Sequence, residues 1–255
     1  MDTFLFGPGD RLFGAYYEGF GPPTAPPVLF CNGLGQDGMR SHLLLRHLAR
    51  RLSAVGGPVL QFDYRGTGDS WGDPDGNTLT ELREDTATAM QELLDISARP
   101  RAVTLGVRLG AWLALEHSDR VIAWDPILAG KDYVTSLQTQ NRKLEQRRDD
   151  APPPSQATDA RNPELAGYRY ATKLLDELKE LDLERVLGER KFERLALITG
   201  NEADRAAASV SLKPRSVEMT CFPANPAHWT SVSRFERSLT PFPSLTELCE
   251  TVSRW

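Results

Sequence analysis

The sequence has few of the residues that carry redox, metal or membrane functions. Its 255 residues include three cysteines, Cys31, Cys221 and Cys249, which lie far apart and have no metal-ligand spacing. No apolar run approaches the roughly 20 residues that cross a bilayer. The first residues also lack the basic segment and apolar stretch of a secretory signal peptide. We therefore expect reduced thiols, no cofactor, no metal, no membrane span and a cytoplasmic location.

Neither sign of charge is in large excess. The chain has 30 Lys and Arg residues against 35 Asp and Glu residues, for a formal net charge of −5. This balance gives no reason to expect a nucleic-acid partner. With 40% hydrophobic residues over this length, the chain can bury one substantial core. The composition therefore predicts a single α/β domain with an insertion.

Short apolar runs alternate with helical patterns along most of the chain. After a predicted hairpin over residues 4–17, strand patterns occur at residues 28–31, 59–63, 102–105, 121–124, 195–199 and 217–221. Helical patterns occur at residues 41–54, 80–98, 111–116 and 244–254. This alternation predicts a mostly parallel central sheet with helices on both faces. The ligand site is then expected beyond the carboxyl ends of the strands.

The pattern changes between residues 130 and 190. A polar helix is predicted over residues 132–148, a proline-rich break at 151–155 and further helix over 168–187. We interpret residues 130–190 as a helical cap over the site, and residues 1–129 and 191–255 as the core. The alternative is a peripheral insertion that touches no ligand. In either case the insertion offers a surface for a protein partner.

One turn has the frame of a nucleophile elbow but lacks the nucleophile. The sequence GVRLG at residues 106–110 follows an apolar strand pattern and precedes a helical one, as in the G-x-S-x-G turn. Arg108 stands where serine is expected. A guanidinium stays charged at physiological pH and has no lone pair for attack. The turn therefore indicates a fold whose usual serine chemistry is missing.

Motifs on three loops resemble those of the α/β-hydrolase superfamily. They are NGLG at residues 32–35, FDYRGTGDS at 62–70 and the GVRLG turn. A narrower set is similar to exosortase A system-associated hydrolase type 2 proteins: GMRSH at 38–42, GVRLGA at 106–111, WDP at 124–126 and ELAGY at 164–168. The wider resemblance implies an α/β-hydrolase fold over nearly the full chain. The narrower one implies that Arg108 is a trait of that group.

The superfamily pattern also implies site residues by their place in the chain. The acid belongs after the penultimate strand, where Asp204 stands beside Glu202, and the histidine belongs after the last strand, at His228. The alternative for His228 is a surface histidine. The implied oxyanion and substrate-binding positions are Asn32, Gly33, Leu34 and Leu109.

The remaining polar candidates have weaker support from their positions. His42, His47 and His117 fall on predicted helices, and we interpret them as structural. Cys31 and Ser70 lie near the expected mouth of the site, but neither stands on a strained elbow beside a predicted base. We therefore expect neither of them to act as the nucleophile.

A cation at residue 108 needs a counter-charge. It stands at a helix N-terminus, where the dipole disfavours a positive group by roughly 0.3–1 kcal/mol. Asp125, at the end of the next strand, and Asp204 are the carboxylates that topology places nearest. An anionic ligand is the other candidate partner, because a guanidinium binds carboxylates and phosphates through paired hydrogen bonds.

These observations leave three hypotheses for function. The first is a serine-independent enzyme acting on an anionic or acyl-bearing small molecule, by water-activated hydrolysis, acyl transfer, elimination or cyclisation. Arg108 would bind the anion, and His228 with Asp204 would act as acid and base. The second is a catalytically silent binding protein for a carboxylate or acyl ligand. For Arg108 itself, the alternative to any function is a structural Arg–Asp pair that plugs a dead site. The third is an interaction subunit of a biosynthetic system.

Overall fold

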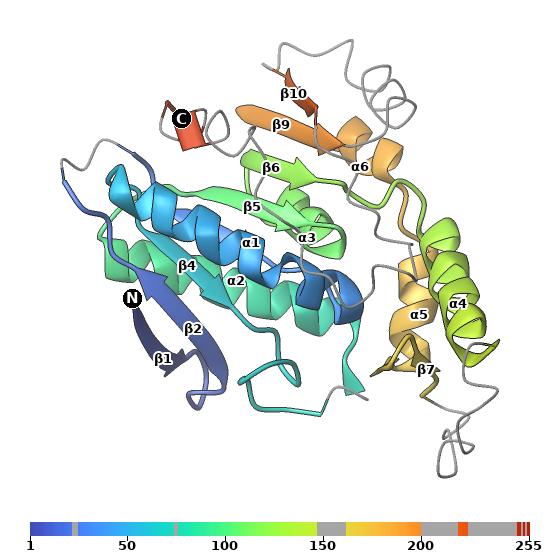
Figure 1. Cartoon of the computed structure of the whole chain (residues 1–255). Coiled ribbons are helices and arrows are strands. Elements are labelled where there is room, and N and C mark those ends of the chain that lie inside the picture. Colours follow the sequence, from blue (N-terminus) through green and yellow to red (C-terminus); the bar gives the residue numbers. More distant parts are fainter. Residues whose placement is uncertain are drawn as a thin grey trace.

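The central sheet of this computed structural model is mostly parallel, as predicted. The structure describes residues 1–21, 25–73, 76–146, 162–199, 219–223, 249–250, 252 and 254–255. Within these ranges, an eight-stranded sheet runs in the order β1 (Asp2–Phe6), β2 (Leu12–Tyr17), β4 (Val59–Phe62), β3 (Val28–Cys31), β5 (Val103–Val107), β6 (Arg120–Trp124), β9 (Arg194–Thr199) and β10 (Met219–Pro223). The β1–β2 and β2–β4 pairs are antiparallel and the others parallel (Figure 1).

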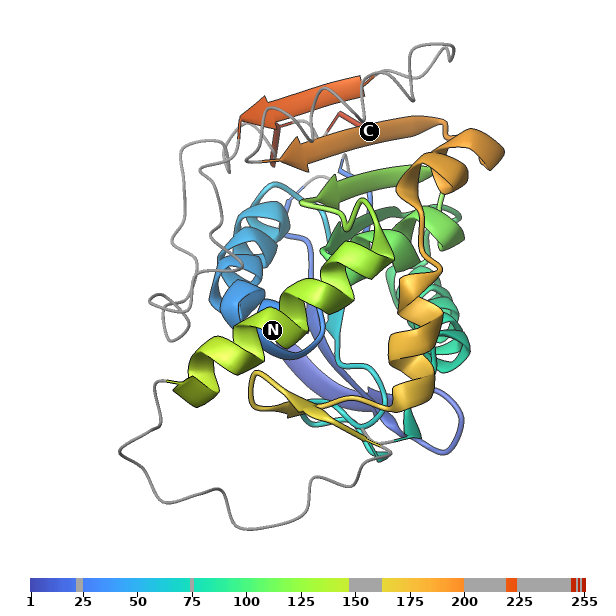
Figure 2. The same cartoon turned by 90° about the vertical axis from the view of Figure 1, so that its right-hand side faces the viewer.

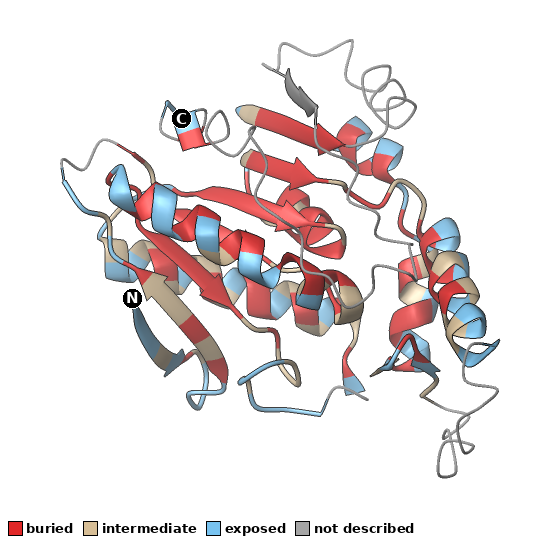
Figure 3. Ribbon diagram, in the orientation of Figure 1, coloured by how far each residue is buried: buried red, intermediate tan, exposed pale blue. Residues whose placement is uncertain are grey.

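Helices cover both faces of this sheet. The helices of the core are α1 (Gly35–Ala54), α2 (Leu79–Ser97) and α3 (Leu109–His117). In β3, Val28 and Phe30 pack in the cluster that contains the leucines of α1, whereas Leu29 and Cys31 pack in the cluster of α2 and α3. The central strands β3, β4, β5 and β6 are therefore buried on both sides (Figure 3), which explains their nearly continuous apolar sequences.

The start of α2 is specified locally. The Thr78 hydroxyl accepts the amide of Glu81, and the Glu81 carboxylate accepts the amide of Thr78, which is a capping box. The sequence also predicted the hairpin of β1 and β2, and its register pairs Phe6 with Leu12. The observed bounds of the hairpin and of α2 agree with the predicted bounds to within two residues, because both elements depend on neighbours in the sequence.

The described part of the insertion combines helices with a small hairpin. Its elements are α4 (Gly130–Gln146), β7 (Glu164–Leu165), β8 (Tyr168–Arg169), α5 (Thr172–Lys179) and α6 (Leu183–Glu189). The prediction of continuous helix over residues 168–187 is wrong, because β8 pairs with β7 and residues 180–182 separate α5 from α6. Ala166 and Gly167 both have positive φ and form the turn of the β7–β8 hairpin.

The insertion packs onto the core at the carboxyl ends of the parallel strands. Figures 1 and 2 show α4, α5 and β7 together beyond the arrowheads of β5 and β6. The Glu177 carboxylate on α5 accepts the Leu79 amide at the start of α2, at 2.6 Å. The indole of Trp112 on α3 donates to the carbonyl of Ile127, 2.7 Å away, just before α4. These contacts hold the insertion where the ligand site is expected.

Candidate functional site

Arg108 occupies the sharp turn between β5 and α3. Its φ of 56° and ψ of −114° are strained for a residue with a side chain. Its amide donates to the carbonyl of Trp124 at 3.0 Å. A Cβ at Gly106 would collide with the backbone of Gly110, and one at Gly110 would collide with the carbonyl of Cys31. The strand–turn–helix geometry expected of GVRLG is therefore present, and the turn packs directly on the end of β3.

The guanidinium of Arg108 is held by groups of the protein. Its Nε donates to Oδ2 of Asp37 at 3.3 Å, and its Nη1 donates to the carbonyl oxygen of Asp125 at 3.1 Å. The guanidinium carbon lies 5.5 Å from the ring centroid of Tyr133, within cation–π range. The side chains of Arg108 and Asp37 are only 17% and 8% exposed. This cation is therefore neutralised inside the fold.

The structure adds Asp37 to the carboxylates expected near Arg108. Asp125, one of the two expected residues, contacts Arg108 through its main-chain carbonyl. The carboxylate that forms the ion pair belongs to Asp37. Asp204, the other expected partner, lies outside the described residues.

Asp37 reaches Arg108 because α1 begins earlier than its sequence suggests. A loop was predicted over residues 32–36 and helix only from residue 41, but α1 begins at Gly35. A Cβ at Gly38 would collide with the carbonyl of Gly33, so glycine allows the helix to approach the loop. Asp37 stands in the first turn of α1, where the helix dipole favours a negative charge. No motif in the sequence pointed to Asp37.

Tyr133 of α4 closes the same cluster from the insertion. Its hydroxyl donates to Oδ2 of Asp37 at 3.2 Å, so one carboxylate oxygen accepts from both Tyr133 and Arg108. Burial first, and then the negative charge of Asp37, raise the pKa of Tyr133 well above its ordinary value. The phenol is therefore neutral and acts as a donor at physiological pH.

The predicted oxyanion loop lies against the elbow. Asn32, Gly33 and Leu34 follow β3, and Leu109 is the first residue of α3. The Asn32 side-chain amide donates to the carbonyl of Phe62 at 2.9 Å, which fixes this loop to the end of β4. The structure thus brings the Asn32–Leu34 stretch, Leu109, Arg108 and the Asp125 carbonyl to one edge of the sheet.

The predicted acid and base lie outside the described ranges, and the two residues not expected to be nucleophiles make structural contacts or are buried. His228 and Glu202 lie outside those ranges, as Asp204 does. Cys31 is fully buried, and burial raises the pKa of its thiol far above the ordinary value. The Ser70 hydroxyl donates to the Asp63 carbonyl at 2.6 Å and accepts the amide of Phe13 at 2.8 Å. Neither Cys31 nor Ser70 is placed as a nucleophile.

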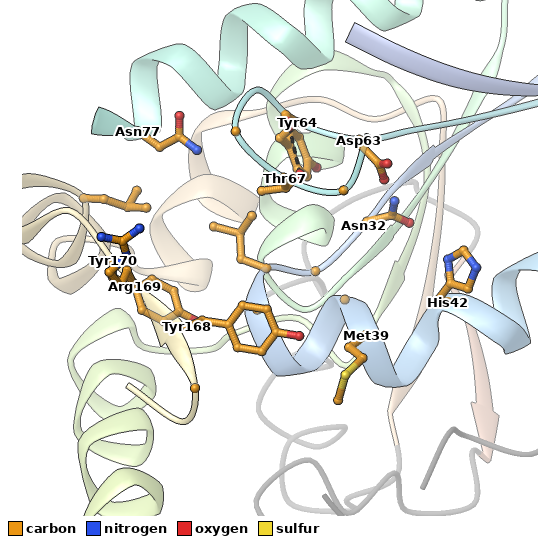
Figure 4. A pocket seen from close by; sticks show the side chains of 18 of the residues that line it. Asn32, Met39, His42, Asp63, Tyr64, Thr67, Asn77, Tyr168, Arg169 and Tyr170 are labelled. Carbon is orange, nitrogen blue, oxygen red and sulfur yellow. Dashed lines mark hydrogen bonds between the residues drawn. The ribbon is translucent and has the colours of Figure 1, made fainter. Parts of the chain in front are cut away.

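A cavity of about 640 Å³ lies between two core loops and the β7–β8 hairpin (Figure 4). This volume suits a small organic ligand. The described lining residues are Asn32, Gly33, Leu34, Gly35, Gly38, Met39, His42, Asp63, Tyr64, Gly66, Thr67, Gly68, Asp69, Asn77, Glu164, Gly167, Tyr168, Arg169, Tyr170 and Leu174. Arg108, Asp125 and Leu109 are not among them. Because the hairpin contributes to the lining, the insertion forms part of the cavity wall.

Asp63 and His42 face one end of this cavity. Oδ2 of Asp63 accepts the amide of Asp69 at 3.1 Å. Burial raises the pKa of Asp63, while the amide of Asp69 and the charge of His42 act in the opposite direction. His42 was interpreted as structural because it falls on a helix, but it stands on the cavity-facing side of α1 (Figure 4). Helical periodicity alone did not reveal which surface that side faces.

The loop over residues 63–70, which lines this end of the cavity, is held in place by an ion pair on the side away from the cavity. The Asp85 carboxylate accepts from the backbone amide, Nε and Nη2 of Arg65, at 2.8, 2.9 and 2.7 Å. The Asn77 side chain donates to the carbonyl of Arg65 at 2.7 Å. The Asp85 side chain is 3% exposed, so the contact is sheltered from solvent. Arg65 and Asp85 therefore position the loop without facing the cavity.

Two kinds of feature are not found in the described ranges. Within them, His, Cys, Asp and Glu side chains form no group of three or more that could hold a metal ion. The helices there also include none with the length and hydropathy of a transmembrane segment.

Comparison with known proteins gives a consistent picture. The model of the "Alpha/beta hydrolase family" matches residues 28–242. Est1E from Butyrivibrio proteoclasticus, solved with ferulic acid, is similar at TM-score 0.62 and 13% identity, covering 95% of this chain and 92% of that one. Mouse alpha/beta hydrolase domain-containing protein 10 aligns at TM-score 0.58 and 15% identity, covering 100% and 99%.

Proline iminopeptidase from Mycobacterium smegmatis is similar at TM-score 0.58 and 14% identity, covering 98% of this chain and 97% of that one. A search of curated proteins found no match. Identities this low show a shared fold and leave the reaction open.

Proposed function

This chain belongs to the α/β-hydrolase family, and we propose that it binds a small organic molecule beside an elbow that supplies no nucleophile. The observation that carries the proposal is the ion pair between Arg108 and Asp37, 3.3 Å apart at Nε and Oδ2. A protonated guanidinium has no lone pair to attack an acyl carbon. The pair favours the structural Arg–Asp plug over an anion-binding role for Arg108, and we therefore propose a catalytically silent binding protein.

The Asp37 pair also weakens the case for Arg108 as an anion-binding group. An anionic ligand would either displace the buried carboxylate of Asp37, which already accepts from Arg108 and Tyr133, or bind beside it to other donors of the guanidinium. The second arrangement places two negative groups side by side. Separating a buried ion pair leaves an uncompensated charge, at a cost of about 3–5 kcal/mol. The cavity lined by Asp63 and Tyr168 offers a ligand a site with no such cost.

A serine-independent enzyme is the second candidate. It is favoured by the geometry that brings Arg108, Leu109 and the Asn32–Leu34 stretch to one edge of the sheet. In this candidate Arg108 binds the anion of the substrate, and His228 with Asp204 transfers the proton. The substrate would be an anionic or acyl-bearing small molecule.

The narrower resemblance suggests the biological process in which this protein acts. The motifs at residues 38–42, 106–111 and 164–168 resemble those of exosortase A system-associated hydrolase type 2 proteins. We accordingly propose a biosynthetic role, with the insertion as a surface for a protein partner. The thiols of Cys31 and Cys249 are buried and are not joined in a disulfide, which is compatible with the cytoplasmic location that we propose.

The test compares turnover and occupancy in the wild type, Arg108→Ala and His228→Ala. Crystals are soaked with an uncharged fragment set, and a panel of nitrophenyl esters is assayed in solution. We expect fragments in the cavity of all three proteins and no acyl-enzyme burst in any of them. Turnover by the wild type that is lost in His228→Ala would support the enzyme instead. Crystals with no fragment in the cavity would contradict the proposed function.

A further inference from the structure

The cavity carries hydrogen-bond acceptors at one end. Asp63 and Asn32 lie there side by side, with His42 next to them on α1 (Figure 4). The Asp63 carboxylate accepts the amide of Asp69 through Oδ2 at 3.1 Å. A carboxylate has about four acceptor positions, so Asp63 can accept further hydrogen bonds from a ligand in the cavity. This end of the cavity therefore calls for a hydrogen-bond donor.

The other end carries aromatic side chains. Tyr168 and Tyr170 line it, beside Arg169 (Figure 4). Tyr170 is 3% exposed, and burial raises the pKa of both tyrosines, so their phenols stay neutral. Aromatic side chains bind flat rings by stacking or by edge contacts. The shape and chemistry of this end suit a planar ring system.

Negative groups outnumber positive ones in the described lining. Asp63, Asp69 and Glu164 contribute three carboxylates, against the guanidinium of Arg169 and the imidazole of His42. Opposite charges attract more strongly in a partly enclosed site than in open water. The lining therefore favours a cation over an anion, the opposite of what an arginine at the elbow suggested.

We infer that the cavity takes a protonated amine carried on a planar ring, with the ammonium between Asp63 and Asn32 and the ring against Tyr168. This inference rests on the proposed function, because it names the class of ligand for the same cavity. An ammonium group supplies three donors. At least one of them binds the carboxylate of Asp63, which lines the cavity. Discrimination against a carboxylate ligand follows from repulsion by the same carboxylates.

The test is isothermal titration calorimetry with three indoles that differ in one terminal group. They are tryptamine, tryptophol and indole-3-propanoate, which end in an ammonium, a hydroxyl and a carboxylate. We expect tryptamine to bind at least about tenfold more tightly than tryptophol, and indole-3-propanoate to bind most weakly. Equal affinities, or tighter binding of the carboxylate, would overturn the inference.

Variants locate the binding site. Asp63→Asn keeps a carbonyl oxygen for the amide of Asp69, and should lower tryptamine affinity about tenfold while changing tryptophol less than about threefold. Tyr168→Leu should weaken all three indoles about equally. Asp95→Asn is the matched control, because Asp95 is an exposed carboxylate on α2 outside the lining. An unchanged tryptamine affinity in Asp63→Asn would overturn the assignment of the ammonium site.

A further variant keeps the test decisive if Asp63→Asn does not fold. Glu164 is an exposed wall residue of β7, so Glu164→Gln should lower tryptamine affinity about twofold to threefold and leave tryptophol unchanged. An equal effect on both ligands would overturn the inference. If none of the indoles binds while uncharged fragments occupy the cavity in crystals, the amine inference fails and the proposed function stands. If nothing occupies the cavity, both fail.

Discussion

Asp37 and Arg108, 71 positions apart in the sequence, form a buried ion pair at the turn between β5 and α3. The pair joins the first turn of α1 to the N-terminus of α3, where an unpaired cation would be disfavoured by the helix dipole. The hydroxyl of Tyr133 adds a hydrogen bond from the insertion to the same carboxylate oxygen. One carboxylate therefore connects three parts of the fold.

Replacing Arg108 should destabilise the protein without creating an esterase. Arg108→Ser leaves the Asp37 carboxylate buried and unpaired, and we expect the free energy of unfolding to fall by about 2–4 kcal/mol. Urea unfolding measures the change, and nitrophenyl-ester hydrolysis tests for gained activity. Arg101→Ser is the control, because its ion pair with Glu193 is exposed and should contribute less than about 1 kcal/mol. An acyl-enzyme burst in Arg108→Ser would contradict the account.

Removing the hydroxyl of Tyr133 should loosen the contact between insertion and core. Tyr133→Phe loses the 3.2 Å hydrogen bond to Asp37 and should lower the free energy of unfolding by about 1–2 kcal/mol. The ring is retained, so its packing against Arg108 is expected to persist. Unchanged stability in urea would show that the hydroxyl contributes nothing to the cluster.

The same variant should change how stability depends on alkaline pH. Because the pKa of Tyr133 is raised in the folded protein, the unfolded chain loses this proton first as the pH rises. The contribution is therefore fully present below the unfolded pKa of about 10 and is lost above it. Wild type should lose stability more steeply than Tyr133→Phe above about pH 10. Parallel curves from urea unfolding would contradict this assignment.

Breaking the Arg65–Asp85 contact should disturb the loop at the cavity. Asp85→Ala removes the acceptor of three hydrogen bonds from Arg65, which remains about one third exposed. We expect a loss of about 2 kcal/mol in unfolding free energy, together with faster amide exchange in residues 66–70. Glu84→Gln is the control, because the Glu84 side chain is 60% exposed. Unchanged exchange in the loop would contradict the positioning role of this pair.

Amine binding should weaken in acid. Burial raises the pKa of Asp63 above its ordinary value. The hydrogen bond from the Asp69 amide and the charge of His42 lower this pKa, whereas the negative charge of Asp69 raises it. Protonation of Asp63 removes the counter-charge of the ammonium, so tryptamine affinity should fall as the pH drops through that pKa. Calorimetry from pH 4 to 8 checks this, and a flat profile would contradict the role of Asp63.

The sequence predicted those features that depend on neighbours in the chain. The elbow at residues 106–110 follows from the spacing of two glycines, and the start of α2 follows from its capping box. The contact between Arg108 and Asp37 depends on how α1 packs against the loop after β3. Gly35 and Gly38 weaken the local helical signal, so Asp37 was expected in or beside a loop. Tertiary packing overrode that signal.

In the insertion, too, one element was predicted from local sequence and another was not. The polar helix α4 was predicted within two residues at each end, whereas the β7–β8 hairpin was expected to be helical from Tyr168 onward. Pairing of two-residue strands leaves almost no periodic pattern in the sequence. The hairpin nonetheless lines the cavity with Tyr168, so the part hardest to predict is the part that shapes the ligand site.

A double-mutant cycle between Arg108 and Asp37 tests the central claim most directly. Unfolding free energies are measured in urea for the wild type, Arg108→Met, Asp37→Asn and the double variant. If the pair is structural, the coupling free energy should be about 1.5–3 kcal/mol, with the double variant more stable than Arg108→Met alone. A coupling below about 0.5 kcal/mol would contradict the claim, because it would leave the guanidinium of Arg108 available for an anionic ligand.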